Sequence, residues 1–251
     1  MLTIENGYII LDKEVNPNDK KKITGHLFVQ LAGLDEYAKP GDAVLSLLKY
    51  YKNDVDKKYL YRGDLAEKMI GFMLKKNNKE YIYYSEEDKK KNNYDFFPNY
   101  KFCGGIPDFE IPKESAIHEC KSKSMEKIKD IIAKLPKGEL WQGLYYAYLR
   151  KCKYLMMDYV FFDKETEDLI FKNQKPKTLD NCKVKFFPYQ IIWGDEQINP
   201  KLCYVYAKDI KDKIIEAICY YDKCLTEKRI PLEDVSPQVL KKIGLTNEDG
   251  L

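Results

Sequence analysis

The order of helix-like and strand-like segments is the feature that most constrains the fold of this chain. Apolar residues recur at helical spacing in the segments 23–34, 42–51, 63–76, 139–152 and 205–226. Strand patterns, rich in apolar and aromatic residues, occupy 3–13, 80–85, 100–111, 115–122, 154–163 and 183–193. Because helices and strands follow each other along the chain, we predict an α/β fold with a central mixed sheet flanked by helices.

The length of 251 residues suffices to bury the core of one large α/β domain without help from metals or disulfides. The sequence shows no internal repeat and no clear linker. We therefore predict a single domain over residues 1–251, with a core at about 20–225 and a helical C-terminal tail at 226–251.

Capping and turn signals set the expected boundaries of several elements. Thr24 is expected to cap the first helix and Asp42 the second. The third helix is expected to begin near Gly63 and to bury Phe72 on its apolar face. The strongly charged segment 86–93 is typical of a hairpin tip, so we expect its consecutive lysines to be solvated.

Composition excludes several classes of protein. With 43 Lys and Arg against 40 Asp and Glu, the chain is not basic overall, so any contact with nucleic acid must come from local clusters. Its seven cysteines contain no C-x-x-C pair, which argues against a zinc ribbon and against a secreted disulfide framework. We see no secretory signal and no run of ~20 apolar residues, and we therefore expect an intracellular protein without a membrane span.

The segment HECKSKS at 118–124 places a charged pair on one face of a strand. Because strand side chains alternate, Glu119 and Lys121 point to one face, whereas His118 and Cys120 point to the other. Taken alone, such a pair is commonly an ion pair at an exposed edge. A second acidic residue, Asp108, lies on a strand expected to pair with this one, so two carboxylates and a lysine would converge.

Converging carboxylates favour a bound cation. Two acidic groups held close together repel each other unless a cation neutralises them, and oxygen ligands select a hard ion such as Mg²⁺ or Mn²⁺. A lysine beside that ion can orient an attacking water and offset charge on a phosphate. The pattern therefore predicts hydrolysis of a phosphodiester.

These residues resemble a known family. Pro107-Asp108 followed by Glu119-Cys120-Lys121 is similar to the signature of the PD-(D/E)xK nucleases. Three further stretches, ITGHLFVQLAGLDEYAKPGDAVLSLL, RGDLAEKMI and WQGLYYAYL, look in their order and spacing like the lambda-exonuclease-type viral recombinase nucleases of the YqaJ-like branch. The likeness spans roughly residues 20–165.

The resemblance implies a metal site and a role for each matching residue. Glu67, Asp108, Glu119 and the backbone carbonyl of Cys120 would hold one or two Mg²⁺ or Mn²⁺ ions. Lys121 would position the attacking water.

The resemblance also implies contacts with DNA. Gln142 and Tyr146, on one face of a helix, would orient the active site and contact the DNA backbone. Tyr146 could equally be core packing, because its helix is rich in aromatic residues. Arg62, one turn ahead of Glu67, is a candidate phosphate contact.

The chain departs from the family where the lambda-type enzymes hold a 5′ phosphate. They use a serine in an I-T-x-S stretch and an arginine just before it, whereas this chain has Ile23-Thr24-Gly25-His26 preceded by Lys20, Lys21 and Lys22. Thr24, Lys21, Lys22 and His26 are therefore candidate DNA contacts, and dependence on a 5′ phosphate stays open.

The resemblance implies an exonuclease that resects duplex DNA ends for recombination or repair, in a phage-infected or bacterial cytoplasm. A single-strand annealing protein would be its partner, and a trimer would fit the lambda-type relatives. Two alternatives stay open: an endonuclease of restriction or structure-specific type on the same fold, and a non-catalytic module that binds DNA or protein.

Overall fold

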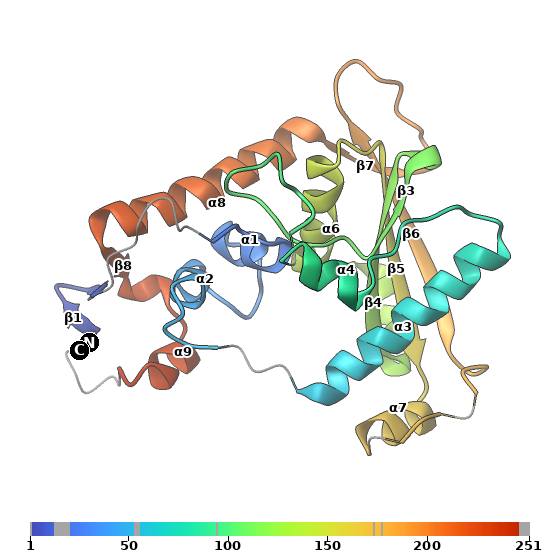
Figure 1. Ribbon diagram of the computed structural model, residues 1–251, viewed down its shortest axis with the longest axis horizontal. Helices are drawn as coiled ribbons and strands as arrows, with labels where there is room; N and C mark the ends of the chain where they lie inside the picture. The colour runs from blue at the N-terminus through green and yellow to red at the C-terminus, as the bar shows by residue number, and fades with distance from the viewer. Residues whose placement is uncertain are drawn as a thin grey trace. The chain divides into compact units, whose positions relative to one another are not determined.

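The computed structural model describes residues 2–12, 21–52, 56–93, 95–172, 174–176 and 178–245 (Figure 1). The chain forms two compact units. The first comprises Met1–Asn53, Phe96–Gly105 and Lys211–Leu251, and the second comprises Asp54–Asp95 and Ile106–Ile210. The assignment of residues 1–251 to a single domain stays a prediction.

The second unit is built on a five-stranded mixed sheet (Figure 1). Its strands, in spatial order, are β3 (Phe109–Ile111), β4 (Ala116–Ser124), β5 (Tyr154–Phe162), β6 (Lys183–Ile192) and β7 (Cys203–Tyr206). β4 runs parallel to β5, and β6 runs parallel to β7, while the other two pairings are antiparallel. The predicted mixed sheet is confirmed.

Helices cover both faces of this sheet. The helices of this unit are α3 (Lys57–Lys76), α4 (Glu86–Lys91), α5 (Ile128–Ala133), α6 (Lys137–Leu149) and α7 (Lys164–Phe171), with short 3-10 turns at Pro112–Glu114 and Met125–Lys127, and α3 and α6 are the two that lie against the sheet. α3 packs Leu65 and Ile70 into a core with Val160 and Phe162 of β5. α6 approaches the opposite face, where a side chain at Gly143 would meet Leu155 and Met157 of β5.

Gly143 is the reason that α6 can lie so close to the sheet. A Cβ atom at this position would stand 2.8 Å from Leu155 Cδ1 and 2.9 Å from Met157 Sδ, which is closer than real Cβ contacts allow. The close approach holds the first turns of α6 over β4, and these turns carry Gln142.

The third predicted helix begins earlier than expected. α3 begins at Lys57, because the Asp56 side chain accepts a hydrogen bond from the Lys58 backbone N–H and caps the helix. The expected burial of Phe72 is wrong, since 68% of its surface is exposed. The buried stripe of α3 runs through Leu65, Ala66, Ile70 and Leu74, so Phe72 projects from another side of the helix.

The charged segment 86–93 is not a hairpin tip. Its first six residues form α4, which Ser85 and Asp88 open with a reciprocal capping box. The expected strand at 80–85 reduces to one antiparallel bridge, between Ile82 and Glu110 of β3.

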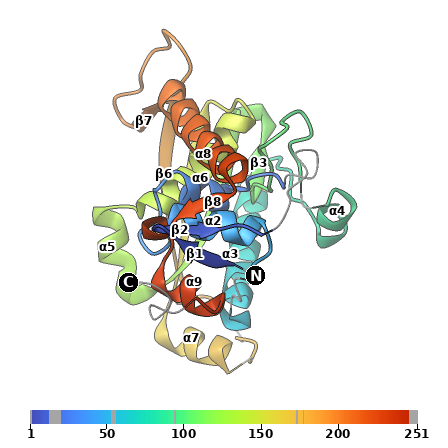
Figure 2. The same ribbon diagram turned by 90° about the vertical axis from the view of Figure 1, so that its left-hand side faces the viewer.

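The first unit contains a three-stranded antiparallel sheet, in the order β1 (Thr3–Glu5), β2 (Tyr8–Ile10) and β8 (Arg229–Pro231) (Figure 2). Its helices are α1 (Gly25–Leu31), α2 (Pro40–Leu47), α9 (Pro237–Lys242) and most of α8 (Ala207–Glu227), with a 3-10 turn at Leu232–Asp234. No helix within the described ranges is long and apolar enough to cross a membrane.

Thr24 is the N-cap of α1, as predicted, although its side chain makes no capping hydrogen bond. Asp42 is not the N-cap of α2, because that position belongs to Lys39. The Asp42 carboxylate instead accepts hydrogen bonds from the backbone N–H of Lys39 at 3.0 Å and of Ser236 at 2.8 Å. It therefore ties α2 to the turn before α9. The part of the predicted tail at 246–251 lies outside the described residues.

Candidate active site

The edge of β4 opens beyond the end of its pairing with β3. β3 pairs with residues 116–118 of β4, whereas β4 continues alongside β5 as far as Ser124. Asp108 immediately precedes β3, and its Oδ2 accepts a hydrogen bond from the Cys120 backbone N–H at 2.7 Å. The Asp108 carboxylate therefore lies at the start of this opening, next to the strand that carries Glu119 and Lys121.

Glu119 and Lys121 share one face of β4, as the alternation predicted. Lys121 Nζ lies 2.7 Å from Glu119 Oε1 and 3.2 Å from Oε1 of Gln142 on α6. Glu119 is 1% exposed, and its second oxygen, Oε2, is buried without a hydrogen-bond partner within the described part of the chain. One carboxylate oxygen is thus left for a group that is not part of the protein.

Glu67 joins this group from α3. Burial and the charge of Asp108 raise the pKa of Glu67 to about 7. Burial and the charge of Asp108, with a smaller contribution from Glu67, raise the pKa of Glu119 to about 8. The pKa of Asp108 is also raised, chiefly by burial. Asp108 thus acts as a neighbouring like charge on both glutamates, and Glu67 acts in the same way on Glu119.

Lys121 is the cation that partly offsets these carboxylates. Burial by itself would lower the pKa of Lys121, but the charges of Glu119 and Asp108 outweigh that effect and raise it. Lys121 therefore remains an ammonium ion at neutral pH. It cannot act as a base in this state, whereas it can donate hydrogen bonds to a water molecule or a phosphate.

The donors suit a hard divalent cation in their chemistry. They are carboxylate oxygens, one of which is buried and has no hydrogen-bond partner among the described residues, and burial together with the charge of Asp108 raises the pKa of both glutamates. Among the described residues, no three His, Cys, Asp or Glu side chains form a ready-made metal cage. Cys120 lies between Glu119 and Lys121, and its N–H contacts Asp108. Binding of a metal ion by its backbone carbonyl stays a prediction.

The two candidates on α6 differ in their surroundings. Gln142 contacts Lys121 and so belongs to the site. Tyr146 is 4% exposed, and its ring packs against Tyr145 with the ring centroids 5.4 Å apart. The packing accounts for the residue type at Tyr146, and contact of either side chain with DNA stays a prediction.

Arg62 is engaged by the protein itself. Its guanidinium donates to the Ser122 carbonyl at 3.2 Å and forms an ion pair with Glu167 of α7. These contacts join α3 to the end of β4 and to α7. A role for Arg62 as a phosphate contact stays a prediction.

The other candidate DNA contacts belong to the first unit. Lys22 Nζ donates to the Phe97 carbonyl at 2.9 Å, and His26 Nε2 lies 3.0 Å from Gln30 Nε2. Lys21 is exposed, and Lys20 lies outside the described residues. Contact of Thr24, Lys21, Lys22 or His26 with DNA stays a prediction.

Two residues near the carboxylates were missed by sequence reasoning. The Tyr83 hydroxyl hydrogen-bonds to Glu67. Lys89 of α4 is half-buried, its Nζ lies 5.8 Å from the centre of the Tyr83 ring, and its charge lowers the pKa of Glu67 and Asp108. The expectation that Lys89 is merely solvated is therefore wrong. The capping box of Ser85 and Asp88 is the sequence signal that could have predicted the helix on which Lys89 lies.

The opposite face of β4 carries a second buried pair. His118 points away from Glu119, as predicted, and its Nδ1 lies 2.7 Å from Oδ2 of Asp158 on β5. Asp158 is fully buried, and its Oδ1 has no hydrogen-bond partner within the described residues. This pair links the neighbouring strands β4 and β5.

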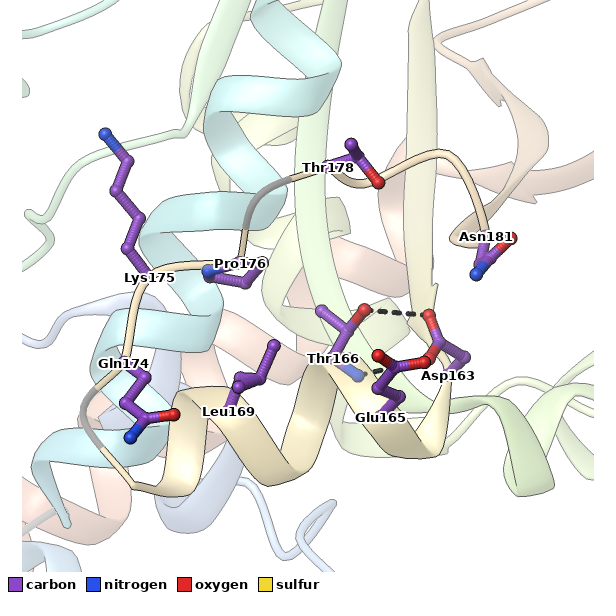
Figure 3. Close-up of a pocket in the computed structure, with 9 residues that line it drawn as sticks. All are labelled: Asp163, Glu165, Thr166, Leu169, Gln174, Lys175, Pro176, Thr178 and Asn181. Atoms are coloured by element: carbon purple, nitrogen blue, oxygen red, sulfur yellow. Dashed lines mark hydrogen bonds between the residues drawn. The ribbon is translucent and has the colours of Figure 1, made fainter.

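A cavity of about 400 Å³ lies beside α7, and Figure 3 shows residues that line it. Asp163, at its edge, accepts hydrogen bonds from the backbone N–H of Thr166 at 3.1 Å and from its hydroxyl at 2.8 Å. Asp163 is thus used as the N-cap of α7. The predicted catalytic residues, all of which are described, do not line this cavity.

Comparisons with known proteins bear on the fold. No family model matches the chain. A segment of 110 residues, 43% of this chain, is 30% identical to the uncharacterized protein MG373 of Mycoplasma genitalium and covers 38% of its length.

The crystal structure of a phage-related exonuclease from Haemophilus somnus superposes with a TM-score of 0.53, over 83% of this chain and 96% of that one, at 16% identity. An alkaline exonuclease from Laribacter hongkongensis gives a TM-score of 0.48 at 12% identity, over 82% of this chain and 90% of that one. The first of these two structures shows that the chain shares the fold of a phage-related exonuclease.

Proposed function

We propose that the chain is a metal-dependent deoxyribonuclease of the PD-(D/E)xK type, and specifically an exonuclease that resects duplex DNA ends for recombination or repair. The observation that carries this proposal is the group of Glu67, Asp108, Glu119 and Lys121 at the open edge of β4, where one Glu119 oxygen is buried and has no hydrogen-bond partner among the described residues. The fold shared with a phage-related exonuclease supports it.

The three carboxylates and the Cys120 carbonyl would hold one or two Mg²⁺ or Mn²⁺ ions. A bound ion would polarise the scissile phosphodiester and offset the repulsion among the carboxylates. Glu119 Oε2 would be stabilised most by a bound ion, because this oxygen is buried and has no hydrogen-bond partner among the described residues.

Lys121 would position the attacking water and stabilise negative charge on the phosphate. It is suited to this role because it stays charged and because Glu119 and Gln142 fix its ammonium from two sides. Gln142 therefore acts as a positioning residue. Tyr83 would act on the same group through Glu67, and Lys89 through both Glu67 and Asp108.

The resemblance to the lambda-exonuclease-type family supports a set of partners in this proposal. These are duplex DNA ends, a single-strand annealing protein and further copies of the chain in a trimer, in a bacterial or phage-infected cytoplasm.

The proposal is tested by digestion of end-labelled linear duplexes, with and without a 5′ phosphate, beside covalently closed DNA. The wild type should degrade the linear DNA in Mg²⁺ or Mn²⁺ and not in EDTA. Lys121→Ala should lose at least about 100-fold in rate, as for loss of a charge-stabilising group. Lys113→Ala is the matched control, because the ion pair that Lys113 forms is an exposed one with Glu80.

Each result has a distinct meaning. Cleavage of closed DNA would show that the protein is an endonuclease on the same fold and not an exonuclease. DNA binding without hydrolysis in either ion would show that it is a non-catalytic module.

A further inference from the structure

A cavity of about 310 Å³ opens beside Glu67 and is lined by residues of α3, by Tyr81 and Tyr83, and by Phe109 of β3. We propose, resting on the proposed function, that this cavity binds an unpaired nucleobase of the strand whose phosphate is cleaved at the carboxylate group. Glu67 lines both the cavity and the candidate metal site, so a base held here belongs to a nucleotide beside the scissile phosphate.

The walls of the cavity are aromatic. Phe109 is 1% exposed and forms a fixed floor, with its ring 5.4 Å from Tyr81 and 5.3 Å from Tyr83 between centroids. Phe72 and Tyr83 stand at the mouth, where they are 68% and 45% exposed. Every nucleobase has a flat face that stacks on such rings, so this binding does not depend on the sequence of the strand. A single exposed Phe is ordinary on a surface, but here it extends an aromatic wall.

Gly71 leaves space in the cavity, although the packing around it would also accept a larger residue. A Cβ atom at Gly71 would lie 3.5 Å from Phe109 Cε1 and 3.5 Å from the Tyr81 hydroxyl, which is ordinary van der Waals contact. Alanine would therefore fit, and it is the better residue inside a helix. The glycine keeps the cavity deeper at the expense of helix stability, which is expected of a binding surface and not of a packed core.

The charges at the rim suit a nucleotide. Lys68 and Lys75 are exposed, line the cavity, and lie seven residues apart on one side of α3. They can contact the phosphates on either side of a bound base. A nucleobase carries no charge, so Glu67 does not repel it. Burying a free anion against Glu67 would be unfavourable, which favours a base over a phosphate inside the cavity.

A base can reach the cavity only if it leaves the duplex stack. Unpairing is unfavourable, and stacking on aromatic side chains offsets it by about ten- to hundredfold in affinity per base. The cavity thus supplies part of the energy that frees the nucleotide to be cleaved. Frayed ends and single-stranded tails should bind more tightly than blunt ends.

Binding is measured in EDTA, so that the result does not depend on hydrolysis. The probes are two short single-stranded oligonucleotides, one with 2-aminopurine and one with an abasic site at the same position. The wild type should quench 2-aminopurine fluorescence and prefer the base-containing probe by about tenfold or more. Phe72→Ala and Gly71→Ala should each reduce this preference.

The variants separate binding from folding. Phe72 is exposed, so its loss should not unfold the protein, and Gly71→Ala should hold or raise the melting temperature. Phe186→Ala is the matched control, because Phe186 is 42% exposed on β6 of the same unit and does not line the cavity. Lys68→Ala and Lys75→Ala should each weaken the binding of both probes, because each removes a proposed phosphate contact. Lys76→Ala is their control, since Lys76 is exposed on α3 and does not line the cavity.

The outcomes distinguish this inference from the proposed nuclease. If Lys121→Ala abolishes hydrolysis while Phe72→Ala and Gly71→Ala bind both probes like wild type, the base site is overturned and the nuclease stands. If the wild type never hydrolyses DNA but its quenching depends on Phe72, the base site stands and the nuclease does not. Equal affinity of the wild type for the two probes overturns the base site in either case.

Discussion

The two faces of β4 carry pairs that look alike and differ in what surrounds them. Lys121 meets Glu119 at 2.7 Å on one face, and His118 meets Asp158 at 2.7 Å on the other. Both acids are buried, and each keeps one oxygen without a partner within the described residues. The geometry of a single pair therefore does not distinguish a functional site from a structural one.

The difference is the number of like charges near each acid. Burial, Asp108 and Glu67 raise the pKa of Glu119 to about 8, against the opposing effect of Lys121. Burial also raises the pKa of Asp158, but the hydrogen bond and charge of His118 oppose it, and Asp108 contributes least. Glu119 is therefore surrounded by like charges that Lys121 only partly offsets, whereas the main charged neighbour of Asp158 is its one partner, His118.

The largest expected effect comes from neutralising each acid with its amide. Glu119→Gln should lower the rate of DNA hydrolysis about 100- to 1,000-fold, because it removes a charge from the proposed metal site. Asp158→Asn should keep the rate of the folded enzyme within about threefold. Single-turnover rates on a linear duplex measure both. Equal losses would mean that the two faces do not differ in function.

Stability should respond in the opposite order. His118→Ala leaves Asp158 buried without its partner and should lower the free energy of unfolding by about 3 kcal/mol. Glu119→Gln, measured in EDTA, should not lower it, because it relieves repulsion with Asp108 and Glu67. Urea unfolding of the two variants gives both values. A larger loss in Glu119→Gln would show that the Lys121 pair is itself a structural contact.

The pH dependence of stability should expose the repulsion among the carboxylates. The pKa values of Glu67 and Glu119 are about 7 and about 8, above the ordinary value of 4.5. Between pH 4.5 and 8 the folded protein therefore binds more protons than the unfolded chain, so stability falls as the pH rises through this window.

Melting temperatures from pH 5 to 8 measure this fall. In EDTA the curve should decline toward pH 8, and Mg²⁺ should restore stability most at the high end. Glu119→Gln should flatten the decline. A melting temperature that climbs steadily over this range in metal-free buffer would contradict the raised pKa values.

The smallest effect is expected at Gln142, which acts through Lys121. Gln142→Ala removes one acceptor at 3.2 Å from the Lys121 ammonium and should lower the rate about fivefold, as for one hydrogen bond. The Michaelis constant should change little. A loss as large as that of Lys121→Ala would assign Gln142 a direct contact with the substrate.

Several features of the site could be read from local patterns. The two-residue period of a strand placed Glu119 and Lys121 together and His118 on the other face. The pairing of β3 with β4 brought Asp108 next to the Cys120 backbone, as the neighbouring strand patterns indicated.

Other features were missed because they depend on cues outside the pattern used. The apolar stripe of α3 is clear only from Leu65 onward, so the cap at Asp56 and the first two turns were overlooked. The high density of charge in 86–93 led to the prediction of a solvated hairpin tip. The segment instead contains a capped helix that places Lys89 near Glu67. Asp42 has a capping residue type, but its carboxylate serves a distant N–H at Ser236.

The sequence by itself determined that helices and strands alternate in an α/β fold, and on which face of β4 Glu119, Lys121 and His118 lie. Those properties follow from backbone geometry over a few residues. The tertiary structure alone decided that Glu67 on α3 lies near Asp108, and that one oxygen of Glu119 has no partner among the described residues. It also decided that a cavity with aromatic walls opens beside Glu67. Burial and repulsion between charges arise from segments that are distant in sequence, and no local pattern records them.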